Sequence, residues 1–105
     1  MTETLLYAFT ASAGDGIDPN SLLVVAANGT LYGTTLFGGA SNNGTVFELI
    51  PPTSPGASWT ETIIHSFTGF DIEPQGLTSA PGGILYGTTY TGGSLNLGTL
   101  FAVTP

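Results

Sequence analysis

Apolar and polar residues alternate in short segments along most of the chain, and glycine or proline separates these segments. Residues 2–9 alternate in this way, and residues 60–67 repeat the alternation with similar residues. An alternation with a period of two predicts a β-strand with one buried face, whereas no window keeps the 3.6-residue period of an amphipathic helix. The pattern therefore predicts an all-β protein.

Three more strands are expected between these two segments. They cover residues 21–27, 31–37 and 45–50. The first is an almost continuous apolar run, which is typical of a strand buried on both faces. Asn28 and Gly29 then provide a two-residue hairpin turn, and Gly82 and Gly83 provide its counterpart later in the chain. These short connections predict antiparallel pairing.

The chain contains an internal repeat. The segment LYGTT at residues 31–35 returns at residues 85–89, and the following glycine pair and the GTxF segment return with the same offset of 54 residues. Residues 2–10 return at residues 60–68 with an offset of 58. We therefore expect a single two-unit domain over residues 1–105, with repeat 1 at about 2–52, a linker at 53–59, and repeat 2 at about 60–105.

Four antiparallel strands in about 50 residues are typical of one blade of a β-propeller. The predicted fold is therefore two four-stranded antiparallel β-propeller blades per chain, one of them split between an N-terminal strand at 2–9 and C-terminal strands within 77–105. Gly33 and Gly87 are expected to allow close approach of a neighbouring blade. Because two blades cannot close a ring, we expect a homotrimer with six blades or a homotetramer with eight, or alternatively a filament.

Composition restricts the partners of this domain. The chain has seven carboxylates and neither lysine nor arginine, so we expect no binding to nucleic acids or to anionic membrane surfaces. It has no cysteine, which excludes disulfides and thiolate metal sites. No apolar run approaches the length of a membrane helix, and no signal peptide is recognised, so a mature, trimmed or cytosolic chain is expected.

The combination of LYGTT, GG, GTxF and WTET before a strand that ends in Phe resembles the GloVer-type tandem repeat of choice-of-anchor proteins. This resemblance covers nearly the whole chain and implies a secreted or extracellular protein, since family members are long secreted bacterial chains without an assigned activity. Asp15, Gly16 and Pro19 keep the family's D-G…P element, whereas residues 71–74 keep only part of it. The resemblance supplies no catalytic residue.

Oxygen-bearing side chains in the two loops after the Phe-ended strands are candidate ligands for Ca²⁺. They are Asp15, Asp18 and Asn20 in the first loop, and Asp71 and Glu73 in the second. Their spacing around a glycine suits a hard cation, but the full EF-hand pattern is absent. The alternative is that these side chains cap backbone N–H groups in turns, with no cofactor at all, and this alternative is favoured.

Two aromatic residues, Trp59 and Phe70, lie outside the regular strands. They are candidate sugar-stacking residues, although the covering of blade edges is the favoured explanation. His65 is the only histidine and aligns with Tyr7, so we interpret it as an aromatic residue in a tyrosine position rather than a general base.

No catalytic motif accompanies these residues, and an enzyme is not expected. The predicted function is a non-enzymatic, self-assembling β-propeller that serves as a structural or generic binding module, with copies of itself as partners. The alternative is a multivalent carbohydrate-binding lectin with sites repeated around the ring. A glycoside hydrolase, which needs two suitably spaced carboxylates, is a distant third.

Overall fold

The fold is all-β, as predicted. The computed structural model describes residues 3–10, 12, 14–69 and 72–105, and none of these residues is helical. The strands are β1 (Gly16–Pro19), β2 (Val24–Val25), β3 (Leu31–Gly38), β4 (Thr45–Ile50), β5 (Thr60–Ser66), β6 (Ile72–Ser79), β7 (Leu85–Thr91) and β8 (Thr99–Val103).

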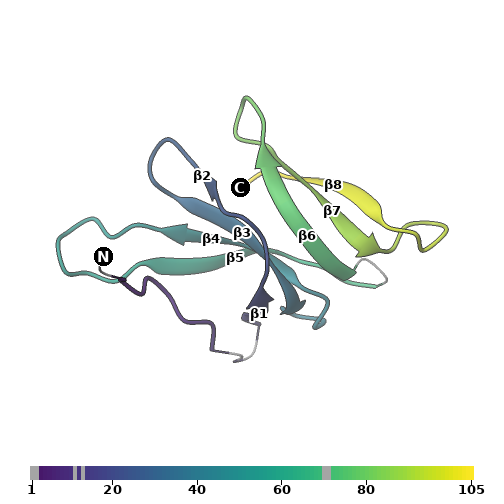
Figure 1. Cartoon of the computed structure of the whole chain (residues 1–105), viewed down its shortest axis with the longest axis horizontal. Helices are drawn as coiled ribbons and strands as arrows, with labels where there is room; N and C mark the ends of the chain where they lie inside the picture. Colours follow the sequence, from purple (N-terminus) through teal and green to yellow (C-terminus); the bar gives the residue numbers. More distant parts are fainter. Residues whose placement is uncertain (1–2, 11, 13, 70–71) are drawn as a thin grey trace.

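The strands form two antiparallel sheets that lie next to each other, with β6 against β3 (Figure 1). The first sheet has the order β1-β3-β4-β5, and β2 pairs with the other end of β3. The second sheet has the order β6-β7-β8. The strand order of the second sheet thus repeats that of the first, but within the described chain it has no strand equivalent to β5.

The same hydrogen bonds stabilise the central hairpin of each sheet. The hydroxyls of Thr35 and Thr45 lie 2.8 Å apart on β3 and β4, and those of Thr89 and Thr99 lie 2.6 Å apart on β7 and β8. At the hairpin turns, the side chains of Asn42 and Asn96 accept hydrogen bonds from the backbone N–H groups of Gly38 and Gly92. Both asparagines have a φ near +58°, a conformation that Asn tolerates better than most residues.

Gly33 and Gly87 make room for an aromatic ring of the adjacent strand in their own sheet. A Cβ on Gly33 would lie 2.7 Å from the Phe47 ring, and one on Gly87 would lie 2.5 Å from the Phe101 ring. The expected close approach to a neighbouring blade is therefore wrong for these glycines, because the close neighbour is the next strand of the same sheet.

The strand predicted at 21–27 is formed only at Val24–Val25, as β2, and its predicted burial is wrong. Two short strands, β1 and β2, replace it on either side of an irregular segment, and both pair with β3. Leu22 is 91% exposed and Val25 is 68% exposed, so this apolar run is not buried on both faces. In the second sheet a single strand, β6, takes the place of both β1 and β2. Its pairing with β7 shifts register between Pro74 and Leu77.

The strand predicted at 2–9 is not formed in the described part, residues 3–10. This segment runs along the first sheet near β5 (Figure 1) and anchors there through Phe9, whose ring centroid lies 5.1 Å from that of Phe47. Its alternating pattern is that of a strand, but a strand also needs a neighbour that supplies backbone hydrogen bonds. Within the described chain the outer edge of β5 is unpaired, but residues 3–10 make no backbone ladder with it.

Candidate functional site

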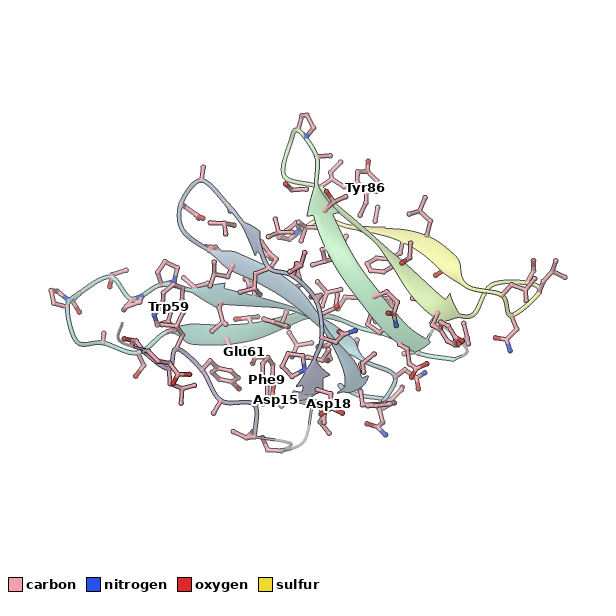
Figure 2. All side chains as sticks on the ribbon, in the orientation of Figure 1. Phe9, Asp15, Asp18, Trp59, Glu61 and Tyr86 are labelled. Atoms are coloured by element: carbon pink, nitrogen blue, oxygen red, sulfur yellow. The ribbon has the colours of Figure 1, made fainter. Side chains whose placement is uncertain are left out.

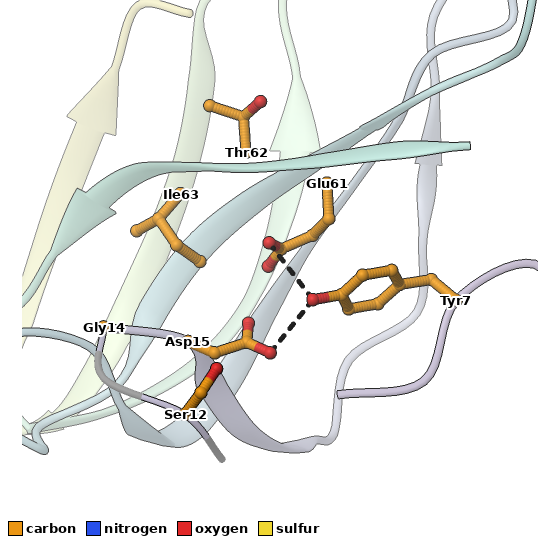
Figure 3. Close-up of a pocket in the computed structure, with 7 residues that line it drawn as sticks. All are labelled: Tyr7, Ser12, Gly14, Asp15, Glu61, Thr62 and Ile63. Atoms are coloured by element: carbon orange, nitrogen blue, oxygen red, sulfur yellow. Dashed lines mark hydrogen bonds between the residues drawn. The ribbon is translucent and has the colours of Figure 1, made fainter. Parts of the chain in front are cut away.

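A hollow lies between the N-terminal segment, β1 and β5. It is open, has a volume of about 440 Å³, and is lined by Tyr7, Asp15 and Glu61 among others (Figure 3). Tyr7 comes from the N-terminal segment, Asp15 directly precedes β1, and Glu61 lies on β5. The N-terminal part of the chain and the distant strand β5 therefore place two carboxylates around one phenol.

Asp15 is the most fully hydrogen-bonded carboxylate of this site, and its residue is only 9% exposed. Its Oδ2 accepts hydrogen bonds from the Tyr7 hydroxyl at 3.0 Å and from Thr10, whose backbone N–H is 2.9 Å away. Its Oδ1 accepts the backbone N–H of Gly16 at 2.8 Å. Burial disfavours the charged form of Asp15, but the hydrogen bonds from Thr10, Tyr7 and Gly16 outweigh it and lower its pKa.

Glu61 shows the opposite behaviour. Burial, reinforced by the hydrogen bond to Asp15 and by the negative charge of Asp15, raises its pKa to about 7. Its Oε1 lies 3.5 Å from the Tyr7 hydroxyl, while its Oε2 is buried without a hydrogen-bond partner. Burial and the hydrogen bond to Asp15 likewise raise the pKa of Tyr7 to about 12. Tyr7 is therefore a hydrogen-bond donor over the whole physiological pH range, and Glu61 takes up a proton near neutral pH.

Two carboxylates with separated pKa values are also the arrangement of an acid–base pair in catalysis. Here the donors to Asp15 belong to the chain itself and come from residues 7–16. They close the loop and fasten the N-terminal segment to β1 and β5. The geometry thus accounts for Asp15 as a structural carboxylate, which is the turn-capping role favoured from the sequence.

The other predicted cation ligands have the following surroundings. The exposed Asp18 has a φ of +60°, and Asn20 bonds to the Pro74 carbonyl on β6 and to the Thr34 hydroxyl. Glu73 lies on β6 with a φ of +57°, and Asp71 lies outside the described residues. Among the residues that the structure describes, no group of three or more acidic or histidine side chains could hold a metal ion.

Of the two predicted aromatic candidates, Phe70 lies outside the described residues. Trp59 is half-buried directly before β5 and two residues before Glu61 (Figure 2). His65 packs edge-to-face on Phe67 at 4.7 Å, as Tyr7 packs on Phe9 at 5.1 Å. This agrees with the interpretation of His65 as an aromatic residue in a tyrosine position.

A second candidate site is the outer face of the second sheet. We define the outer face by Tyr86, Thr88, Tyr90 and Leu100, all of which are exposed. It carries a shallow hollow of about 280 Å³ next to Leu77. The equivalent face of the first sheet, which carries Tyr32, Thr34 and Val46, is covered by the second sheet, since Tyr32 and Leu85 line one cavity between the two sheets.

Sequence reasoning did not identify Tyr7 and Glu61 as partners of Asp15. Glu61 is 54 residues from Tyr7, and only the packing of the N-terminal segment against β5 brings them together. The sequence offered one signal for Glu61. Glu3 and Glu61 occupy equivalent positions in the repeat, and each places a charge in a segment with the alternating pattern of a half-buried strand.

Comparisons with known proteins agree with the repeat. The model of a family described as the Gloeobacter/Verrucomicrobia repeat matches residues 1–105. No curated protein and no solved structure matches the chain. In the part of the chain that the structure describes, no helix is long and apolar enough to span a membrane.

Proposed function

The chain belongs to the Gloeobacter/Verrucomicrobia repeat family, and on this premise we propose that it is a non-enzymatic module that self-assembles through its repeats. Each sheet is one blade of a β-propeller, and three or four chains complete a ring of six or eight blades. The assembled ring serves as a structural element or a generic binding module. Its location outside the cell, as the family resemblance implies, is part of this proposal.

One observation carries the proposal: the same position in the two repeats differs in burial. Val46 on β4 is 0% exposed because the second sheet covers its face, whereas the equivalent Leu100 on β8 is 76% exposed. Burial of a leucine side chain contributes about 2 kcal/mol relative to leaving it in water. A further sheet packed on the outer face would remove this difference, and another copy of the chain provides one.

The charge distribution supports an uncharged, hydrophobic association. The residues that define the outer face include no acidic or basic residue, although the chain carries a net charge of −7.

Light scattering coupled to size exclusion at micromolar concentration tests this proposal. We expect a mass of three or four times the 10.6 kDa of one chain. A folded monomer would contradict it, whereas a filament would retain the blades and contradict the closed ring.

The alternative function, a multivalent lectin, rests on Trp59, which is half-buried at the start of β5. Binding to a glycan array that is lost in Trp59→Ala, with the mass of the assembly unchanged, would favour it over a purely structural role. The acidic hollow does not favour a hydrolase, because Asp15 is held by the chain's own donors.

A further inference from the structure

The second sheet ends in a strand whose outer edge is unpaired within the described chain. In the first sheet, β4 is followed by β5, but β8, the counterpart of β4, has β7 as its only partner strand. The backbone groups along the outer edge of Thr99–Val103 are thus available for pairing with another strand. The chain has no lysine that would protect this edge.

The segment that matches β5 in sequence is the N-terminal segment, and it also matches β5 in packing. Phe67, just after β5, contacts Phe101 of the second sheet with ring centroids 4.9 Å apart. Phe9, its repeat equivalent, contacts Phe47 of the first sheet at 5.1 Å. The N-terminal segment therefore lies against the first sheet as the end of β5 lies against the second, but it forms no strand there.

We infer that residues 3–8 of a second copy of this chain pair antiparallel with β8 and form the fourth strand of the second sheet. This inference rests on the proposed self-assembly and names the surface that carries it. The donor segment keeps its Phe9 contact with its own first sheet, so one short segment joins two chains head to tail. Repeating the contact around a ring leaves no unpaired β8.

The internal pairing of β4 with β5 predicts the register of this contact. Val46 pairs with His65 and Glu48 pairs with Thr62. The repeat offsets convert these pairs to Leu100 with Tyr7, and Ala102 with Thr4, of the second copy. The β4–β5 pairing shifts register between Val46 and Phe47, so the same shift is expected between Leu100 and Phe101.

A side-chain contact of the first sheet also supports the choice of a second copy as the occupant. In the first sheet the Tyr7 hydroxyl lies 3.5 Å from Glu61. The repeat places His65 in the position of Tyr7, and Glu3 of the second copy in the position of Glu61. The proposed pairing thus places a carboxylate of the neighbouring chain next to the His65 ring, as Glu61 lies next to the Tyr7 hydroxyl.

Paired cysteines test the register, because the natural chain has no cysteine that could interfere. Thr4 and Ala102 are both exposed, and the proposed pairing places them opposite each other. The full-length double variant Thr4→Cys/Ala102→Cys should form disulfides between chains under mild oxidation. The matched control is Ala8→Cys/Ala102→Cys, whose residue 8 lies four residues, or about 13 Å, further along the strand. A disulfide requires Cα atoms within about 7 Å, so this control should not cross-link.

Non-reducing electrophoresis detects the disulfide-linked oligomers. It is applied to variants whose assemblies keep the mass of the natural assembly. Covalent oligomers from the first variant and none from the control support the inference. The inference is overturned if the assembly keeps its natural mass but the first variant does not cross-link, or if both variants cross-link equally. The proposed self-assembly would then still stand. A protein that is monomeric throughout overturns both.

Discussion

Two carboxylates that contact the same tyrosine hydroxyl respond to burial in opposite ways. Asp15 stays charged because backbone and side-chain donors surround it, whereas partial burial and the neighbouring Asp15 raise the pKa of the half-buried Glu61 to about 7. Hydrogen bonding thus decides the charge of one residue, and desolvation together with the neighbouring charge decides that of the other.

This difference predicts a pH-dependent stability. Between the ordinary Glu value near 4.5 and about 7, folded Glu61 holds a proton that the unfolded chain releases, so stability falls as the pH rises through this window and levels off above it. Asp15 acts at lower pH: its lowered pKa stabilises the fold above its ordinary value, and this contribution is lost as the pH falls through the folded pKa. Thermal melting at pH 5 and pH 8, at constant ionic strength, should therefore show a lower Tm at pH 8.

The variant Glu61→Gln should reduce this difference in Tm by several degrees, because Gln resembles the protonated acid and does not titrate. Glu48→Gln, which changes the net charge equally on the neighbouring strand, should keep the difference. If the Tm falls between pH 5 and pH 8 by the same amount in Glu61→Gln as in the natural chain, another group causes the fall.

The strands at the ends of the repeats depend on partners more than the central hairpins do. β3 and β4 pair within one repeat, whereas the N-terminal segment has the pattern of a strand but forms no strand within the described chain. A proline at position 4 tests this dependence, because it removes a backbone N–H from the proposed intermolecular ladder without touching Tyr7 or Phe9. Thr4 itself is exposed.

We expect Thr4→Pro to dissociate the assembly while circular dichroism still reports a folded β-protein. Thr4→Val, which keeps both the N–H and the branched side chain, should assemble like the natural chain. The affinity of assembly, measured by light scattering over a dilution series, should fall at least tenfold in the proline variant. Unchanged assembly of Thr4→Pro would exclude residue 4 from a paired strand.

For the whole molecule, the decisive feature is that its two similar sheets have different surroundings. The second sheet covers the first, but nothing in the described chain covers the outer face of the second. Leu100→Glu would place a charge at the centre of the outer face and should abolish assembly without unfolding the chain, because burying an unpaired carboxylate costs several kcal/mol.

Leu97→Glu is the matched control for this prediction. Leu97 is 82% exposed, similar to Leu100, but it lies in the turn between β7 and β8 rather than on the sheet face. Size exclusion with light scattering should give a monomer for Leu100→Glu and the natural mass for Leu97→Glu. Equal masses for both variants would place the assembly surface elsewhere.

The central part of each repeat was predictable because its signals are local. The strands at 31–37 and 45–50 were expected within one residue of the observed β3 and β4, since turn glycines and alternating residues delimit them. The segments 2–9 and 21–27 were mispredicted because their apolar residues indicate strands, but pairing with distant residues decides whether strands form. The candidate site followed the same rule: Asp15 was identified from its turn, whereas its neighbour Glu61 was not.

The sequence by itself therefore determined the all-β class, the repeat and the central hairpins, all of which depend on contacts between residues close in the chain. Only the tertiary structure decided which faces are covered, how β1 and β2 divide the first strand, and that Tyr7 joins Asp15 to Glu61. These features depend on which surfaces meet when the two sheets and the N-terminal segment pack together. Equivalent residues such as Val46 and Leu100 have similar sequence contexts, and only their neighbours in space make one buried and the other exposed.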